Sequence, residues 1–170
     1  MACTLISSFA FACRDSNGGI QEAKIKIFDA SLTGVSESSG TVTFSGSGLT
    51  GWYTYYCEKM TANGSDAGAL STQNGTNVYT QTATYIFNKL QASFRNELKT
   101  LAQARVHIAL KDNNGTAWLF GYTRGMDLTT STSETGTNYE DRSGYTLTFV
   151  GSEPNPIVAI SNYAGLITAP

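Results

Sequence analysis

Few side chains in this chain could support catalysis, and its one histidine, His107, comes first among them. Nucleophilic catalysis by serine or cysteine needs an imidazole to accept the proton. His107 lies in residues 105–111, an alternating segment that predicts a strand with Val106, Ile108 and Leu110 on the opposite side. No catalytic partner stands beside it in the sequence, so we interpret His107 as a histidine of a strand surface or an interface.

The other polar motifs also lack the spacing that chemistry requires. Glu140 and Asp141 are adjacent, so their carboxylates diverge instead of converging on one substrate as a glycosidase pair does. The glycines of Gly18-Gly19 and of residues 46–48 lack the strand-to-helix context and the lysine of a phosphate-binding loop. We interpret the carboxylates as solvated loop charges and the glycines as turn residues.

The cysteines do not form a metal-binding pattern. Cys3, Cys13 and Cys57 cannot all pair with one another, and no C-x-x-C spacing or second histidine indicates a zinc site. The simpler prediction is a reduced environment with no metal and no cofactor. Together with the isolated His107, this pattern predicts that the protein is not an enzyme.

The composition is poor in charge. Charged residues make up 14% of the 170 residues, and the net charge is −2 with a pI near 5.3, whereas about 25% charged residues is usual. No basic field exists to bind nucleic acid tightly by counterion release. A weakly charged exterior rich in Thr and Tyr is compatible with a surface that neighbouring subunits cover, although secreted β-proteins share this composition.

The start of the chain does not match a signal peptide. Residues 1–16 contain a short apolar run, but no basic residue precedes it. No run in the sequence reaches the roughly 18 apolar residues of a membrane span. We therefore expect cytoplasmic synthesis and no membrane partner.

An aromatic segment at residues 52–60 predicts a strand with rings on both faces. Trp52 and Tyr56 fall on one face, and Tyr53 and Tyr55 on the other. Such a strand is more often sandwiched between two sheets, or between a sheet and a neighbouring subunit, than exposed at an edge. An aromatic platform could also bind sugar, so a carbohydrate-binding function stays open at this point.

Residues 61–77 predict a long loop of small polar residues and glycines. Connections of this length are usually functional or disordered. The residues of this candidate functional loop are Thr61, Asn63, Gly64, Ser65, Asp66, Gly68, Leu70, Gln73, Asn74 and Asn77.

The elements around these residues predict a mainly β fold. Strands are expected at residues 23–29, 41–44, 78–87, 105–111, 116–122, 126–131, 145–150 and 157–160, with further loops at residues 31–40 and 132–143. Asn114-Gly115 is a strong signal for a type I′ hairpin turn. One amphipathic helix is expected at about residues 91–102, because Leu90, Phe94, Leu98 and Leu101 share a stripe. We predict one domain over residues 1–170, a β-sandwich or barrel with one flanking α-helix.

The order of motifs in the second half resembles that of the major tail tube subunits of long-tailed phages, particularly Bacteroidetes phages. The resemblance rests on the alternating strand at 78–87, the helix, KDNNG at 111–115, WLFG at 118–121, GYTLTF at 144–149 and EPNP at 153–156. Near the start, the strand that follows Gly18-Gly19-Ile20 also resembles the first strand of those proteins.

This resemblance implies a tail-tube fold and a non-enzymatic virion protein. Six copies would join through their sheets into a ring, and rings would stack into a hollow tube through which the genome passes. The tube would be assembled in the host cytoplasm and contact other tail proteins at its ends, and DNA would pass without specific binding. By this analogy, residues 61–77 would reach the next ring, and part of the chain's acidity would line the bore.

Two other classes of protein remain as alternatives. A head-decoration or other virion protein would use a similar β-fold but bind a capsid lattice. A sugar-binding adhesion module would bind glycans, and binding would be lost on changing Trp52 or Trp118 to Ala.

Overall fold

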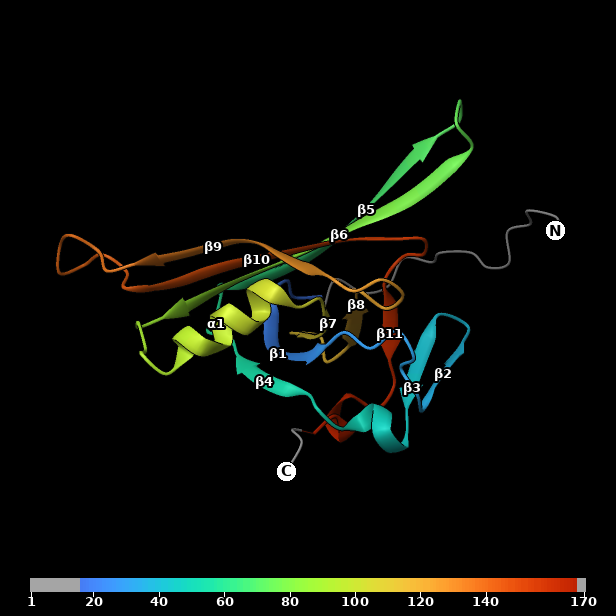
Figure 1. The fold of residues 1–170 in the computed structure, drawn as a ribbon, viewed down its shortest axis with the longest axis horizontal. Helices are drawn as coiled ribbons and strands as arrows, with labels where there is room; N and C mark the ends of the chain where they lie inside the picture. The colour runs from blue at the N-terminus through green and yellow to red at the C-terminus, as the bar shows by residue number, and fades with distance from the viewer. Residues whose placement is uncertain (1–15, 168–170) are drawn as a thin grey trace.

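The computed structural model describes residues 16–167, which form two β-sheets and one α-helix (Figure 1). This mainly β architecture with one helix confirms the predicted fold class. The strands are β1 (Ile20–Ile27), β2 (Val35–Ser38), β3 (Thr41–Phe44), β4 (Tyr53–Tyr56), β5 (Ala62–Ser71), β6 (Thr76–Asn88), β7 (Val106–Asp112), β8 (Ala117–Phe120), β9 (Asp127–Glu134), β10 (Gly144–Glu153) and β11 (Val158–Ile160). The helix is α1 (Phe94–Gln103), and two short 3₁₀ turns are η1 (Gly46–Leu49) and η2 (Tyr163–Gly165).

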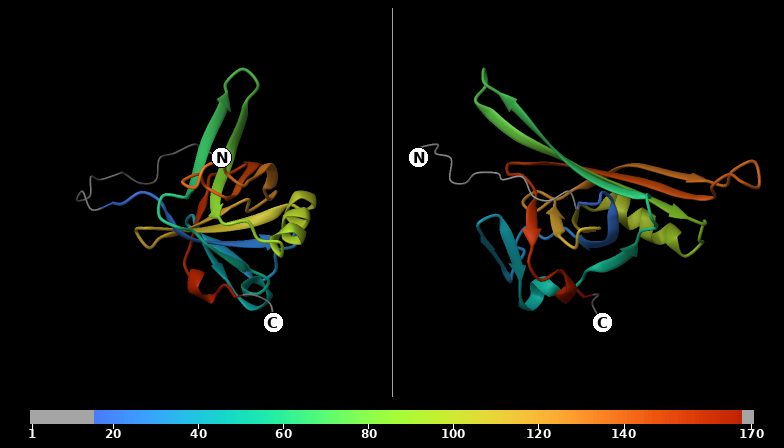
Figure 2. Two further views of the ribbon diagram at one scale, coloured as in Figure 1. Left: turned by 90° about the vertical axis from the view of Figure 1, so that its left-hand side faces the viewer. Right: turned by 180° about the vertical axis from the view of Figure 1, so that it is seen from behind.

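The strands divide into a seven-stranded sheet, ordered β2-β3-β11-β8-β7-β1-β4, and a four-stranded sheet, ordered β5-β6-β10-β9. The four-stranded sheet lies across the top of the molecule in Figure 1, and the rest of the chain lies beneath it. Seen from the side and from behind, the β5–β6 hairpin extends well beyond the body of the protein (Figure 2).

The main core fills the space between the two sheets. Ile25, Ile108 and Leu110 of the larger sheet meet Tyr85 and Phe149 of the smaller one, all of them buried. Because side chains alternate between the faces of a strand, these positions also define which face of the four-stranded sheet points inward. Its other face is turned away from the body.

A second core covers the opposite face of the seven-stranded sheet. Phe44 and Trp52 pack edge to face, with 5.5 Å between their ring centroids, and Leu119 and Leu166 join them. The chain around η1 and η2 closes this side of the sheet, as the views in Figure 2 show. Five consecutive residues of β7, 106–110, are therefore buried, because both faces of this central strand are covered.

The helix confirms the sequence prediction to within a few residues. Its buried Leu101 and half-buried Phe94 and Leu98 pack against the main core, so the predicted apolar stripe is the face that contacts the sheets. The helix begins at Phe94, after Ser93, and not at about residue 91 as predicted.

The KDNNG hairpin is present, but its turn type differs from the prediction. Among its residues only Gly115 has a positive φ, of 87°, so the turn is not type I′, which requires two positive values. The Asp112 carboxylate accepts hydrogen bonds from the amides of Asn114 and Thr116, at 3.0 and 2.8 Å. This capping by Asp112 stabilises a turn in which Asn114 keeps a negative φ.

Three other sequence expectations are wrong. Residues 35–38 form strand β2 and not part of a loop, and β9 continues to Glu134, into the predicted loop at 132–143. The aromatic strand is shorter than expected and is the edge strand β4, hydrogen-bonded within the chain to β1 alone. Its Trp52 end is buried, whereas Tyr56 at its other end is 78% exposed.

Candidate functional site

His107 is a buried structural residue, not the surface histidine that its sequence position indicated. Its Nδ1 lies 2.7 Å from the carbonyl oxygen of Gly121, and the amide of Asp29 donates to Nε2 at 3.3 Å. These contacts select the neutral tautomer that carries its proton on Nδ1. Burial lowers the pKa of His107 below its usual value, so the imidazole stays neutral. Both of its ring nitrogens are hydrogen-bonded to backbone groups.

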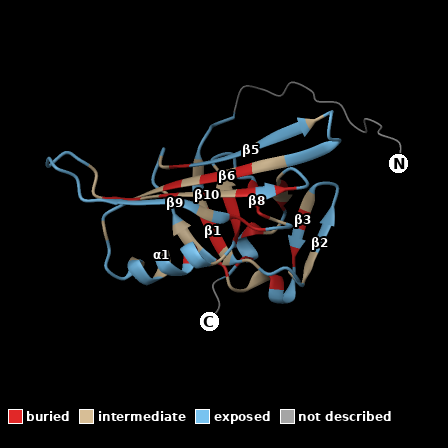
Figure 3. Cartoon of the chain, turned by 45° about the horizontal axis from the view of Figure 1, so that its top comes forward, coloured by how far each residue is buried: buried red, intermediate tan, exposed pale blue. Residues whose placement is uncertain are grey.

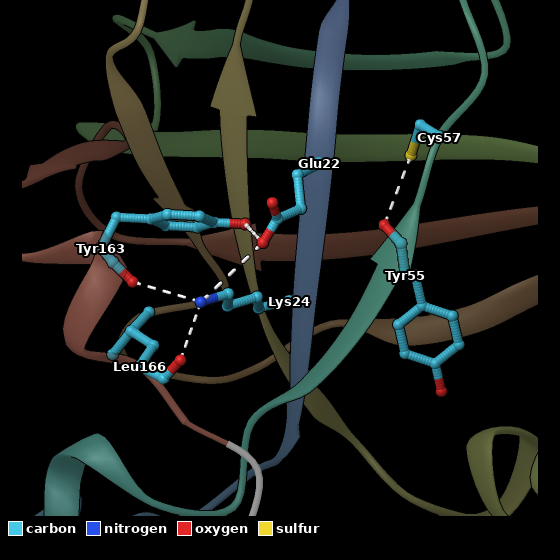
Figure 4. A network of polar contacts seen from close by, with 6 residues as sticks. All are labelled: Glu22, Lys24, Tyr55, Cys57, Tyr163 and Leu166. Atoms are coloured by element: carbon cyan, nitrogen blue, oxygen red, sulfur yellow. Dashed lines mark hydrogen bonds and ion pairs between the residues drawn. The ribbon is translucent and has the colours of Figure 1, made fainter.

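Lys24 is also buried, although its alternation with Ile25 predicts a solvent-facing side chain (Figure 4). Its ammonium donates to the carbonyl oxygens of Leu166 at 2.7 Å and Tyr163 at 3.4 Å, and lies 3.8 Å from the Glu22 carboxylate. The C-terminal segment thus covers the face of β1 that the local pattern assigned to water. Lys24 stabilises this segment and is unavailable to a ligand.

The candidate loop at residues 61–77 is not a loop but most of a long β-hairpin. Strands β5 and β6 pair over ten residues and leave a four-residue turn at 72–75. Of the predicted site residues, Thr61 precedes β5, Asn63, Gly64, Ser65, Asp66, Gly68 and Leu70 lie in β5, Gln73 and Asn74 form the turn, and Asn77 lies in β6. The residues are therefore spread along a projecting ribbon.

The base of this hairpin belongs to the body of the protein. Gly64 faces inward so closely that a Cβ atom there would lie 2.6 Å from Cδ1 of Leu110. Asp66 accepts a hydrogen bond from the amide of Ile157 at 3.0 Å. These two of the predicted site residues therefore anchor the hairpin.

The outer part of the hairpin, residues 67–78, has almost no contact with the body and carries no charged residue. We call it the hairpin tip. Leu70 is 75% exposed and Val78 38% exposed, and Figure 3 shows the outer part of β5 as exposed along its length. The Tyr79 ring lies 3.3 Å from the position of a Cβ on Gly68, at the base of the tip.

Both edges of the four-stranded sheet are open in the described chain. Strand β5 pairs with β6 alone, and β9 pairs with β10 alone. These edges are ten and eight residues long and contain no lysine, arginine or proline. Natural proteins usually protect such edges with short strands, lysine or proline, as the four-residue edge strands β2 and β4 of the other sheet illustrate.

The outward face of this sheet is rich in threonine. By the two-residue alternation, its central side chains include Thr82, Thr84, Thr146 and Thr148, and the Thr84 and Thr148 hydroxyls lie 3.4 Å apart. Charged residues on this face occur toward the ends of β9, at Asp127 and at Glu134, where Glu134 pairs with Arg142 at 3.4 Å. The face is consequently flat, hydroxyl-lined and nearly uncharged.

An aromatic groove of about 450 Å³ lies at the end of β6 opposite the hairpin tip. Its walls include Tyr55 and Tyr56 of β4, Phe87 of β6, Phe94 of α1 and Tyr145 of β10. The sequence analysis did not group these residues. The available signals were the ring at Phe87, which ends the strictly alternating strand, and Phe94, which opens the helical stripe.

Hydrogen bonds hold the groove walls in place. The Tyr145 hydroxyl donates to the carbonyl oxygen of Gln91 at 3.0 Å and lies 3.1 Å from its amide. The Tyr55 hydroxyl donates to Glu97 at 2.7 Å, and burial raises the Tyr55 pKa. The ring centroids of Phe94 and Tyr145 are 5.1 Å apart. The groove is therefore preformed in the single chain.

Metal binding and reactivity depend on the remaining carboxylates and on the one described thiol. Within residues 16–167, no group of three or more His, Cys, Asp or Glu side chains is placed to hold a metal ion. Burial raises the pKa of the Cys57 thiol to about 11, which leaves it protonated at neutral pH; Cys3 and Cys13 lie outside the described residues. In that same part of the chain, no helix has the length and apolar character to cross a membrane.

Comparison with protein-family models, with curated proteins and with solved structures gives no match to this chain. The features of the molecule that bear on its function are the open edges, the threonine face, the hairpin tip and the aromatic groove.

Proposed function

We propose that this protein is a structural subunit whose copies join edge to edge through the four-stranded sheet, and that the assembly is the tail tube of a long-tailed phage. The tube would be a virion component, built of stacked six-membered rings, with other tail proteins at its ends. The motif order of the second half supports the identification with tail tubes. The geometry of the sheet supports self-association independently of that resemblance.

The observation that carries the proposal is the pair of long open edges, β5 and β9, on opposite sides of one sheet. Each edge presents backbone N–H and C=O groups that a further strand can pair. An edge-to-edge contact between β9 of one copy and β5 of the next is heterologous, because it joins two different surfaces. Repetition of such a contact gives a ring when the rotation closes, and closure removes the open edges.

The position of the body favours one orientation in such a ring. The seven-stranded sheet and α1 occupy the inward face of the four-stranded sheet (Figure 2). The larger part of each subunit fits on the outside of a closed ring, where there is more room, which leaves the threonine face toward the axis. The charged groups of such a lining would be Asp127 and the Glu134–Arg142 pair, so it would carry less acidity than the resemblance implies. It suits the passage of DNA, because it offers few cations to hold phosphates by counterion release.

Negative-stain electron microscopy of the purified full chain tests the proposal. The expected result is hollow tubes, or rings, of uniform diameter. Particles that remain monomeric at high concentration would contradict it.

One observation favours a second function, sugar binding, because the groove exposes Tyr56 beside several other rings. Trp52 is fully buried and donates to the carbonyl oxygen of Gly48 at 2.9 Å, so it is no platform for a sugar. The informative substitution is therefore Tyr56→Ala. Glycan-array binding that this change abolishes, by a protein that does not polymerise, would favour the second function.

A further inference from the structure

The hairpin tip and the aromatic groove lie at opposite ends of the same strand. Strand β6 begins in the tip at Thr76 and ends at Asn88 in the groove wall. The ten residue-to-residue steps from Val78 to Asn88 span about 33 Å at the rise of a β-strand. Figure 1 shows the tip at one extreme of the molecule and the start of α1, beside the groove, toward the other.

The hairpin tip lacks the packing that stabilises a ribbon. A two-stranded hairpin on its own is marginally stable in water, and within residues 16–167 no third strand pairs with residues 67–78 and no core lies beneath them. Leu70 lies opposite Asn77, and Gly68 lies opposite Tyr79. Because side chains alternate along a strand, these four residues share one face of the ribbon, and Ala69 and Val78 lie on the other. The tip thus presents the exposed side chain of Leu70 beside Tyr79, on a face that no other segment of residues 16–167 covers.

The aromatic groove matches this face in chemistry. Its volume of about 450 Å³ is in the range of clefts that bind apolar groups. The charged residues of its lining are Glu58 and Lys89, one of each sign, and Glu58 accepts a hydrogen bond from Asn88 at 2.9 Å. An uncharged, partly apolar ribbon can enter such a groove without leaving a buried charge unpaired.

We propose that the hairpin tip of one copy docks in the aromatic groove of the next copy along the β6 direction, with Leu70 against the rings around Tyr56. This inference rests on the proposed function and names the contact that would stack one ring on the next. The contact joins two different surfaces at opposite ends of the subunit, so it repeats without closing and extends the assembly along one axis. Edge pairing then acts within a ring, and tip docking acts between rings.

The test compares the full-length wild type with Leu70→Asp and Tyr56→Lys by negative-stain electron microscopy and sedimentation velocity. Each single substitution places a charge in the contact and is expected to shorten the tubes to single rings or short stacks. The double variant Leu70→Asp with Tyr56→Lys carries opposite charges on the two surfaces and is expected to restore long tubes. Ile167→Asp, at a residue 52% exposed and outside both surfaces, is the matched control and should assemble normally.

The outcomes separate the two proposals. Long tubes from folded Leu70→Asp protein, or a double variant as short as the single ones, overturn tip docking while edge pairing stands. Wild-type protein that forms neither rings nor tubes overturns the proposed function and this inference with it. Far-UV circular dichroism of each variant verifies that the comparison is made between folded proteins.

Discussion

At the scale of single residues, the buried ionisable side chains His107, Lys24 and Glu153 form hydrogen bonds with backbone groups of the protein itself. His107 holds Gly121 and Asp29, Lys24 holds the C-terminal segment, and the buried Glu153 accepts the amides of Thr123 and Arg124 at 3.0 and 2.7 Å. Buried polar groups with such partners stabilise a single arrangement of the chain. These residues therefore stabilise the shape of the subunit.

The neutral state of His107 predicts a pH-dependent stability. Because burial lowers the pKa of the folded state, full stability is expected above the unfolded pKa of about 6.5. Below it the unfolded chain binds a proton that the folded chain does not, and stability falls by up to about 1.4 kcal/mol per pH unit. Urea denaturation at pH 7 and pH 5 measures this loss.

The control for this prediction is His107→Gln, which removes the one histidine of the chain. This variant should be less stable at pH 7, yet its stability should change much less between the two pH values. An equal loss in the wild type and in the variant would assign the pH dependence to other groups. The carboxyls of Asp29 and Asp141 have lowered pKa values, and their contribution is lost only below about pH 4.

Gly144 predicts a large effect of a small change. A Cβ atom there would collide with the carbonyl oxygen of Phe87 in the paired strand β6. Gly144→Ala should therefore destabilise the fold by roughly 2 kcal/mol or more, because two backbones must move apart. Gly18→Ala, where no atom lies within 4 Å of the added Cβ, should leave the thermal midpoint nearly unchanged; similar midpoints for both variants would contradict the predicted close approach.

At the scale of elements, strands with regular alternation could be predicted and strands defined by distant partners could not. Strand β6 follows from its strict alternation. Strand β5 could not be predicted in this way, because its Asn, Gly, Ser and Ala residues have low β-propensity. Its conformation comes from pairing with β6. The burial of Lys24 depends on carbonyl groups 139 and 142 residues away, which no local pattern contains.

The same limit applies to the candidate site. The sequence drew attention to residues 61–77, and part of this segment is the hairpin tip. The aromatic groove could not be predicted from the sequence, because its rings come from four elements, β4, β6, α1 and β10, that only the folded chain brings together.

The open edge of β9 predicts that added charge will block self-association. Thr130 and Thr132 are exposed on this strand, and lysine is a residue that natural edge strands use against pairing. The variant Thr130→Lys with Thr132→Lys should sediment as a monomer at concentrations where the wild type assembles. Its matched control, Thr116→Lys with Ala164→Lys, adds the same charge at exposed positions outside the four-stranded sheet; loss of assembly in both would indicate a general charge effect.

At the scale of the whole molecule, the structure combines a well-packed body with surfaces that residues 16–167 leave uncovered. The body holds two cores, and residues 161–167 are hydrogen-bonded to it. The unused surfaces are the two sheet edges, the threonine face, the hairpin tip and the aromatic groove, and all of them belong to or adjoin the four-stranded sheet. Composition predicted the mainly β fold, whereas assembly into a tube stays a prediction for experiment.

The most direct test of edge pairing is hydrogen–deuterium exchange of the backbone amides at concentrations below and above the onset of assembly. The predicted result is slower exchange in Ala62–Ser71 and Asp127–Glu134 on assembly, because unpaired edge amides gain partners, with little change in the already buried β7. Assembly that leaves exchange in both edge strands unchanged, or a protein that does not assemble at any concentration, would contradict the central claim.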